Sequence, residues 1–168
     1  DPGVFMIAKE VCPEIERHVS TQANNTNYGT YQFWWNLGAT RVVTARELSL
    51  AEIREIRAHI PEEMEIESFI HGAMCISYSG RCLLSNFFTG RDANRGACTH
   101  PCRWKYSLVE ETRPGEYMPV YENERGTYIF NSKDLCMIEH MDDVLEAGID
   151  SLKIEGRMKT ALYVATVA

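Results

Sequence analysis

Residues 40–70, TRVVTARELSLAEIREIRAHIPEEMEIESFI, decide the fold class of this chain. The β-branched run at residues 40–44 predicts a strand, and the alternation of apolar and polar residues over 64–70 predicts another. Between them, residues 49–60 predict a helix that opens with a capping box and stops before a proline. The apolar face of this helix consists of Leu50, Ile53, Ile56 and Ile60. A strand, a helix and a strand in this order predict two parallel strands joined by a right-handed crossover.

The same alternation of helices and strands extends through the rest of the chain. We expect further helices at residues 4–11, 27–37, from 132 or 134 to about 147, and 159–168, and further strands at 15–20 and 151–155. Residues 106–111 and 127–130 predict a small β-hairpin across a segment rich in Pro, Gly and Glu. Only about four strand–helix units fit into this length, so the sequence predicts an α/β fold that is either an open sheet or part of a barrel.

Length and composition indicate one soluble domain. The 45% of apolar residues can form a core without disulfides. No apolar run approaches the ~18 residues of a membrane span, and the start of the chain lacks the pattern of a signal peptide. We therefore expect a cytoplasmic protein with no membrane partner. The chain opens at Asp1 and stops within a predicted helix, so we also expect a fragment of a longer protein.

A group of cysteines interrupts the alternation of strands and helices. Four lie within 28 residues, and Cys136 follows them; the four are Cys75, Cys82, Cys98 and Cys102. In a reducing compartment such thiols favour a metal over disulfides. The six residues between the first two exceed the tight knuckle of a zinc site, whereas glycine-rich irregular loops suit an iron–sulfur cluster. The sequence therefore favours an iron–sulfur site, with zinc and disulfides as weaker alternatives.

The charge distribution is uneven. The net charge is −7, which argues against an RNA-binding surface over the whole molecule. Residues 75–106 carry one acid and five cations, and the cations are Arg81, Arg91, Arg95, Arg103 and Lys105. This basic island suits a partner that bears phosphate or carboxylate groups. Pairing of the same cations with local acids or thiolates is an equal alternative.

Polar side chains gather at the predicted carboxyl ends of the strands, where α/β folds bind their ligands. They include His18, Gln22, Glu67, His71, Lys153 and Glu155. Singly, each more often caps a helix or pairs with a neighbour. Together they predict a pocket for a polar or anionic small molecule, with an acid or base at hand.

Motifs of the commonest catalytic sites are missing from the sequence. It contains no H-E-x-x-H, G-x-S-x-G, P-loop or G-x-G-x-x-G pattern. Zinc-peptidase, serine-hydrolase and nucleotide-binding functions therefore have no motif support. A cysteine nucleophile with a histidine base stays open, with Cys75 and His71 as the weak candidate pair.

Residues 67–85, ESFIHGAMCISYSGRCLLS, resemble the signature of the collagenase-like peptidase family of unassigned catalytic type. The positions that match the signature are Glu67, Phe69, Gly72, Ala73, Met74, Cys75, Gly80, Cys82, Leu84 and Ser85. Four other stretches resemble this family, and especially its branch that forms 5-hydroxyuridine in tRNA: TGRDANRGAC (89–98), PCRWKY (101–106), FNSKDLC (130–136) and SLKIEGRMK (151–159). The resemblance covers essentially the whole chain.

The resemblance implies a partial TIM-barrel-like domain over residues 1–168, with a Cys-rich insertion at about residues 72–131. It also implies oxygen-independent hydroxylation of tRNA, rRNA or ubiquinone precursors, with a 4Fe–4S cluster and, in the tRNA branch, prephenate as a required metabolite. The cluster ligands that match best are Cys75, Cys82, Cys98 and Cys136, with Cys102 as the competitor for the fourth position.

Three functions compete at this point. The first is oxygen-independent hydroxylation of the wobble uridine of tRNA, in which Arg91, Arg95, Arg103 and Lys105 approach RNA phosphates or an anionic cosubstrate. In the same hypothesis the six polar residues at the strand ends line the pocket. The second is a peptidase that acts on collagen-like substrates, which the family name alone supports. The third is an inactive, metal-stapled module whose exposed strand edges lead it to self-associate.

Overall fold

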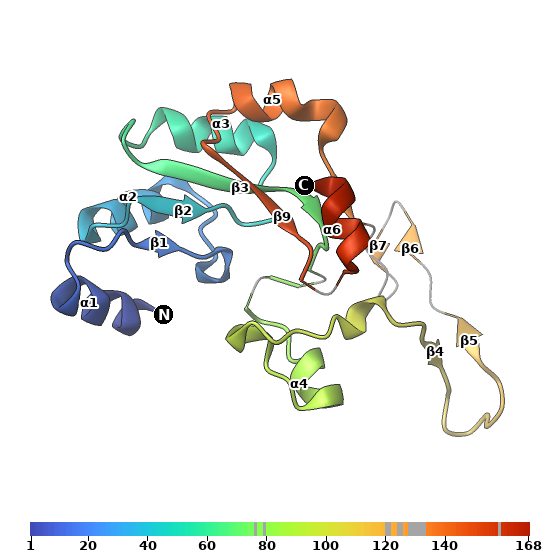
Figure 1. Ribbon diagram of the computed structural model, residues 1–168. Coiled ribbons are helices and arrows are strands. Elements are labelled where there is room, and N and C mark those ends of the chain that lie inside the picture. The colour runs from blue at the N-terminus through green and yellow to red at the C-terminus, as the bar shows by residue number, and fades with distance from the viewer. Residues whose placement is uncertain (76, 79, 120–121, 124–125, 128–133, 158) are drawn as a thin grey trace.

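The computed structural model describes residues 1–168 except 76, 79, 120–121, 124–125, 128–133 and 158. Figure 1 shows a sheet with helices packed along it and a second, irregular region below one end of the sheet. None of the described helices is long and apolar enough to cross a membrane.

Four parallel strands form the centre of the molecule. They are β1 (His18–Val19), β2 (Arg41–Val43), β3 (Glu65–Gly72) and β9 (Ser151–Glu155). They stand side by side in the order β1, β2, β3, β9. A fifth strand, β8 (Leu135–Cys136), pairs antiparallel with the last two residues of β3. The predicted parallel α/β arrangement is therefore confirmed for these four strands.

One helix precedes the first strand, and the other long helices each follow a strand. These helices are α1 (Pro2–Val11), α2 (Tyr28–Leu37), α3 (Leu50–Ala58), α5 (Met141–Glu146) and α6 (Ala161–Val167). Asn27 caps α2 through its side chain, and Gly38 ends that helix at a φ of 96°, where a residue with a Cβ would be strained. The capping box of Ser49 and Glu52 opens α3. Local signals therefore set these boundaries.

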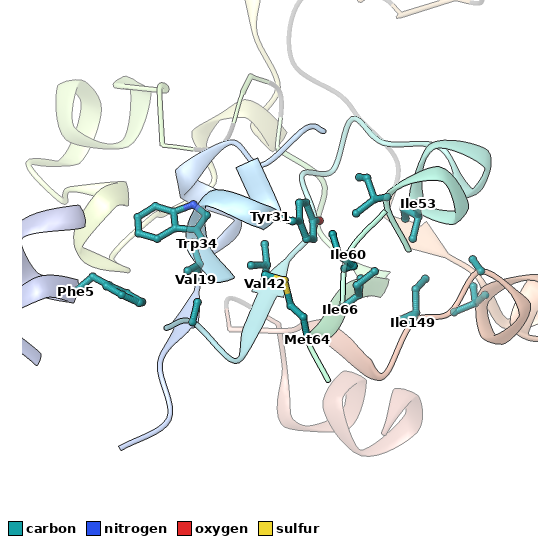
Figure 2. Close-up of a cluster of buried hydrophobic side chains, with 14 residues drawn as sticks. Phe5, Val19, Tyr31, Trp34, Val42, Ile53, Ile60, Met64, Ile66 and Ile149 are labelled. Atoms are coloured by element: carbon teal, nitrogen blue, oxygen red, sulfur yellow. The ribbon is translucent and has the colours of Figure 1, made fainter. Parts of the chain in front are cut away.

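The hydrophobic core lies between the sheet and the helices (Figure 2). Tyr31 from α2, Val42 from β2 and Ile66 from β3 are fully buried within it. Further core side chains come from α1, β1, α3 and α5; they include Phe5, Val19, Ile53, Ile56 and Val144. The indole of Trp34 donates a hydrogen bond of 2.9 Å to the side-chain oxygen of Asn25, which satisfies the indole N–H and that oxygen inside the core. Burial of apolar surface is thus what holds the helices to the sheet.

The opposite face of the sheet carries several charged side chains. Alternate residues of a strand point to opposite faces, so Ile66 enters the core while Glu65 and Glu67 lie on the other side. Arg41 of β2 bonds to both of these glutamates, and Lys153 of β9 bonds to Glu67. This face is therefore bound together by ion pairs between neighbouring strands.

Residues 73–106, called the Cys-rich lobe below, form the irregular region. It contains α4 (Leu84–Thr89) and two 3₁₀ turns, η2 (Ala93–Arg95) and η3 (Pro101–Arg103). Gly72 connects β3 to the lobe at a φ of 112°, and a Cβ there would overlap the backbone of Glu155 on β9. Only glycine fits this junction.

Two predictions of secondary structure are wrong. The helix predicted from residue 132 or 134 begins only at Met141, and the residues before it form β8 and the 3₁₀ turn η4 (Ile138–His140). The amide of Met137 bonds to the carbonyl of Ile70 at 2.9 Å, so pairing with the free end of β3 prevails over local helix propensity. Residue 132 lies outside the described residues.

The hairpin also pairs differently from the prediction. Strand β4 (Ser107–Leu108) pairs with β5 (Met118–Pro119), and β6 (Glu122–Asn123) pairs with β7 (Gly126–Thr127). Residues 128–130 of the predicted second strand lie outside the described residues. Pairing between near neighbours in sequence closes a shorter loop, which costs less entropy. The described strands form an open sheet, which does not close into a barrel.

Candidate functional site

A cavity of about 280 Å³ lies between the carboxyl ends of the strands and the Cys-rich lobe. The sheet side contributes Gln22 after β1, Arg46 after β2, and Lys153, Glu155 and Arg157 in or after β9. The lobe contributes the other wall, with Cys75, Gly80, Cys82, Gly96, Cys98, His100, Cys102 and Arg103. The strand ends therefore meet the cysteines at one place, as the parallel topology predicts.

Four cysteines surround this cavity: Cys75, Cys82, Cys98 and Cys102. The first three are half-buried and Cys102 is buried. Burial raises the pKa of the Cys102 thiol, Arg103 lowers it, and the negative charges of the other three cysteines raise it further. The four thiols thus line one common cavity.

Cys136 lies elsewhere. It is exposed on β8, opposite His71 of β3, and is not among the residues that line the cavity. Its charge contributes to the raised pKa of Tyr163, after burial and Asp134. Of the four cluster ligands that the family resemblance implies, three line the cavity together with Cys102. The fourth, Cys136, lies beside a different group of side chains.

Arginines supply positive charge around the cavity. Arg46 lies with its guanidinium 4.1 Å from the ring centre of Phe69, and burial lowers its pKa while the charges of Cys75 and Glu155 oppose that change. Arg103 donates a hydrogen bond of 3.3 Å to the sulfur of Cys102 and another to the carbonyl of Met74. Fixed cations beside thiolates stabilise the ionised sulfur and can bind an anionic ligand.

His100 is a site residue that the sequence analysis missed. It lines the cavity between two cysteines, and its backbone amide donates to the sulfur of Cys98 at 3.4 Å. Burial lowers the pKa of its imidazole, and nearby Arg103 lowers it further. The ring is therefore neutral at neutral pH and available as a proton acceptor. Its position in the run Cys98-Thr-His-Pro-Cys102 was the available signal.

Glu67 and Lys153 form a joined pair at the edge of the cavity. Lys153 donates to Glu67 at 2.5 Å, and Ser151 and Arg41 donate to the other carboxylate oxygen at 3.1 and 3.3 Å. Burial alone would raise the pKa of Glu67, but these hydrogen bonds and charges lower it overall. Lys153 lines the cavity while Glu67 lies behind it, so the carboxylate holds the ammonium in position.

The other predicted pocket residues divide into two groups. Gln22 and Glu155 line the cavity; the amide of Gln22 donates to the carbonyl of Ala93, and Glu155 accepts from the amide of Arg157 at 3.1 Å. His18 lies apart and contacts Glu16 at 3.4 Å. His71 also lies outside the cavity lining, with its ring 5.7 Å from that of Tyr163 on α6. It is therefore not placed as the base for Cys75.

The predicted RNA-contacting cations also differ in position. Arg91, Arg95 and Lys105 are exposed on the lobe. Arg95 contacts Asp92 at 3.8 Å. Arg103 instead points inward, toward Cys102 and Asp134. Three of the four cations are therefore accessible to a large anionic partner.

The chain belongs to peptidase family U32, whose sequence model matches residues 1–168. Over its full length it is 44% identical to the tRNA hydroxylation protein P of Escherichia coli, of which it covers 46%. It is 50% identical to the tRNA hydroxylation protein P1 of Bacillus subtilis, with 99% of this chain and 39% of that protein aligned. The chain thus spans less than half the length of these two relatives.

A third relative acts on a different RNA. The 23S rRNA 5-hydroxycytidine C2501 synthase of Escherichia coli is 39% identical over 92% of this chain and 22% of that protein. No solved structure matches the chain.

Proposed function

We propose that this chain is part of an enzyme that hydroxylates pyrimidines in RNA, with the wobble uridine of tRNA as substrate and 5-hydroxyuridine as product. The observation that supports this most directly is the presence of four cysteines and several cations in the lining of one cavity at the carboxyl ends of the strands. The names of the three relatives agree, because each describes hydroxylation of RNA or a hydroxylated nucleoside in it. Such a role belongs in the cytoplasm.

The fold supports a barrel-like domain in the complete protein. Four parallel strands carry helices on one face and the site at their carboxyl ends, which is the arrangement of a TIM barrel sector. The other face, which would be the barrel interior, carries the ion pairs of Arg41, Glu67 and Lys153. We propose that the open sheet is one part of such a domain.

A four-iron cluster is the cofactor that the donor set suits best. Four cysteine thiols line the cavity, and thiolates are the ligands that iron–sulfur clusters take. Among the described residues, no group of three or more His, Cys, Asp or Glu side chains is arranged to hold a metal ion. In a four-iron cluster each thiolate binds a different iron, so the sulfurs lie further apart than the ligands of one zinc ion. Cys75, Cys82 and Cys98 would hold it, with either Cys136, which the family resemblance implies, or Cys102, which lines the cavity, as the fourth ligand. When bound, such a cluster supplies electron transfer.

The residues of the chain would bind and orient the reactants. Replacing the C5 hydrogen of uridine by a hydroxyl removes two electrons, so the reaction needs an oxygen donor and an electron acceptor. Arg46, Lys153 and Arg157 line the cavity and suit a small dicarboxylate such as prephenate. The neutral imidazole of His100 can accept a proton there.

The test of this function measures both metal and product. Protein purified without oxygen should contain about four iron and four sulfide per chain. Cys75→Ser should lose that iron and the 5-hydroxyuridine measured by mass spectrometry in tRNA from cells that depend on the protein. Cys12→Ser, which changes a cysteine away from the cavity, should keep both. Retention of 5-hydroxyuridine in Cys75→Ser cells would overturn the proposal.

The same measurement identifies the fourth ligand. Cys102→Ser and Cys136→Ser remove the two competing thiols one at a time, and only the variant that lacks the true ligand should lose iron. The variant that lacks the other cysteine should keep its iron, because that cysteine does not bind the cluster.

A peptidase is the second candidate, since the family name suggests it and a neutral His100 lies in the same cavity as four cysteine thiols. If the protein is a peptidase, His100→Ala and Cys98→Ser should each abolish its hydrolysis of gelatin. In that case His100 is the base and Cys98 the nucleophile, and the two act as a unit.

A further inference from the structure

The outer surface of the Cys-rich lobe carries a group of three exposed aromatic rings and one half-buried ring, that of Tyr106. Phe87 and Phe88 lie on α4, and Trp104 and Tyr106 follow η3; these four residues are called the aromatic patch below. Phe87 is 81% exposed, and Phe88 and Trp104 are 46% and 44% exposed. The ring of Phe88 lies between 5 and 6 Å from those of Phe87, Trp104 and Tyr106. Large exposed aromatic groups of this kind mark interaction surfaces.

Polar contacts inside the lobe fix the arrangement of these rings. The buried hydroxyl of Ser85 accepts a hydrogen bond of 3.0 Å from the amide of Thr99, which holds α4 against the segment before η3. Thr89 bonds to the carbonyl of Ser85 at 2.6 Å. The hydroxyl of Tyr106 donates to the carbonyl of Pro101 at 2.8 Å. The patch is therefore organised before any partner binds.

Cations accompany the aromatic patch. Arg91 follows α4 and Lys105 stands between Trp104 and Tyr106 in the chain; both are exposed. Within the described part of the chain neither of them forms an ion pair, since the salt bridges of the lobe involve Arg95 and Arg103. Their charge thus complements a phosphate backbone.

One part of the patch directly follows a short element that lines the cavity. Pro101, Cys102 and Arg103 of η3 line the cavity, and Trp104 follows them directly. Figure 1 shows α4 at the side of the lobe that faces away from the sheet. A strand bound on the patch would reach the cavity at the Trp104 end, where the chain continues from η3.

We propose that the aromatic patch is a stacking platform for unpaired bases of the RNA substrate, next to the base that enters the cavity. This inference rests on the proposed function and names the surface that recognises the substrate. Proteins read single-stranded RNA by stacking its bases on aromatic rings, while nearby cations hold the phosphates. An apolar protein partner would leave the charges of Arg91 and Lys105 without a counter-charge. Single-stranded RNA offers phosphates for these cations and bases for the rings, so it fits this surface better.

The test compares single-ring variants in RNA binding. The probes are an anticodon stem–loop RNA with uridine at the wobble position and a fully paired RNA duplex of equal length. Phe87→Ala should weaken binding of the stem–loop by about 5- to 150-fold and leave duplex binding unchanged. Phe87→Tyr keeps a ring and should restore the affinity. Leu83→Ala, which removes an exposed apolar side chain of the same lobe, should have no effect.

Salt dependence separates stacking from charge. Arg91→Ala should reduce the slope of log affinity against log salt by about 0.7 to 0.9, because one phosphate contact is lost. Phe87→Ala should leave that slope unchanged, since a stacked base releases no counterion. An equal effect of both variants on the slope would contradict the stacking role.

The two levels of the proposal fail in different ways. If the unchanged protein hydroxylates tRNA and Phe87→Ala binds the stem–loop as tightly, the platform is overturned while the proposed function stands. If the unchanged protein binds neither probe and forms no 5-hydroxyuridine, both are overturned. If Phe87→Ala loses only self-association in light scattering, the patch is a contact between copies and the RNA platform is overturned.

Discussion

The sheet with its helices and the Cys-rich lobe are built on different physical principles. In the sheet, side chains such as Val42, Met64 and Ile66 are completely buried, and helix caps match the sequence signals. In the lobe, most aromatic side chains are exposed, and the buried groups include the polar hydroxyl of Ser85 and the thiol of Cys102. The sheet is therefore stabilised by the hydrophobic effect, whereas the lobe depends on hydrogen bonds, glycine turns and its thiols.

This difference explains where the site lies. A close-packed core leaves no room for a ligand, while a lobe with little apolar packing can surround one. The cavity accordingly forms where the lobe meets the strand ends. The sheet provides fixed positions for Arg46, Lys153 and Glu155, and the lobe provides the sulfurs.

The largest expected effect tests the role of the core. Ile66→Ala removes a fully buried side chain from β3 and should lower the free energy of unfolding in urea by about 4 kcal/mol. Leu83→Ala in the lobe removes an exposed side chain and should change it by no more than about 0.5 kcal/mol. Equal losses in the two variants would show that the lobe has an apolar core of its own.

The junction of the two regions should show the next largest effect. Gly72→Ala adds a Cβ that overlaps the backbone of Glu155 at a positive φ, and should cost about 3 kcal/mol in thermal or urea unfolding. Gly90→Ala is the matched control, because Gly90 also has a positive φ but open space around it. It should cost only about 1 kcal/mol. A Gly72→Ala protein as stable as the control would mean that β3 and β9 can separate without cost.

The smallest effect concerns the charged face of the sheet. Because the pKa of Glu67 is lowered from its ordinary value of 4.5 in the folded protein, its ion pairs stabilise the fold above pH 4.5. That contribution is lost as the pH falls through the lowered pKa and the carboxylate is protonated. Glu67→Gln should therefore be less stable than the unchanged protein at pH 7, and the difference should shrink below pH 4.5 in urea titrations.

The control for this pH dependence is Glu63→Gln, which removes an exposed carboxylate between α3 and β3. A constant difference between the unchanged protein and Glu67→Gln from pH 7 to pH 3 would contradict the ion-pair role of Glu67.

Sequence alone located much of the candidate site. Gln22, Lys153 and Glu155 line the cavity because the carboxyl ends of parallel strands share one edge of a sheet, and Cys75, Cys82 and Cys98 line its other wall. Sequence reasoning could not place His18 or His71, since residues near a strand end can point to either face. It also missed His100, which only the folding of the lobe brings into the cavity.

By itself the sequence determined the elements whose signals are local: α2 and α3 with their caps, and the four parallel strands with their apolar patterns. Tertiary structure decided the rest. The pairing of β8 with β3 joins residues that are distant in sequence. The position of Cys102 in the cavity lining depends on an irregular turn. Such contacts depend on which groups the folded chain leaves unpaired, and no short-range pattern records them.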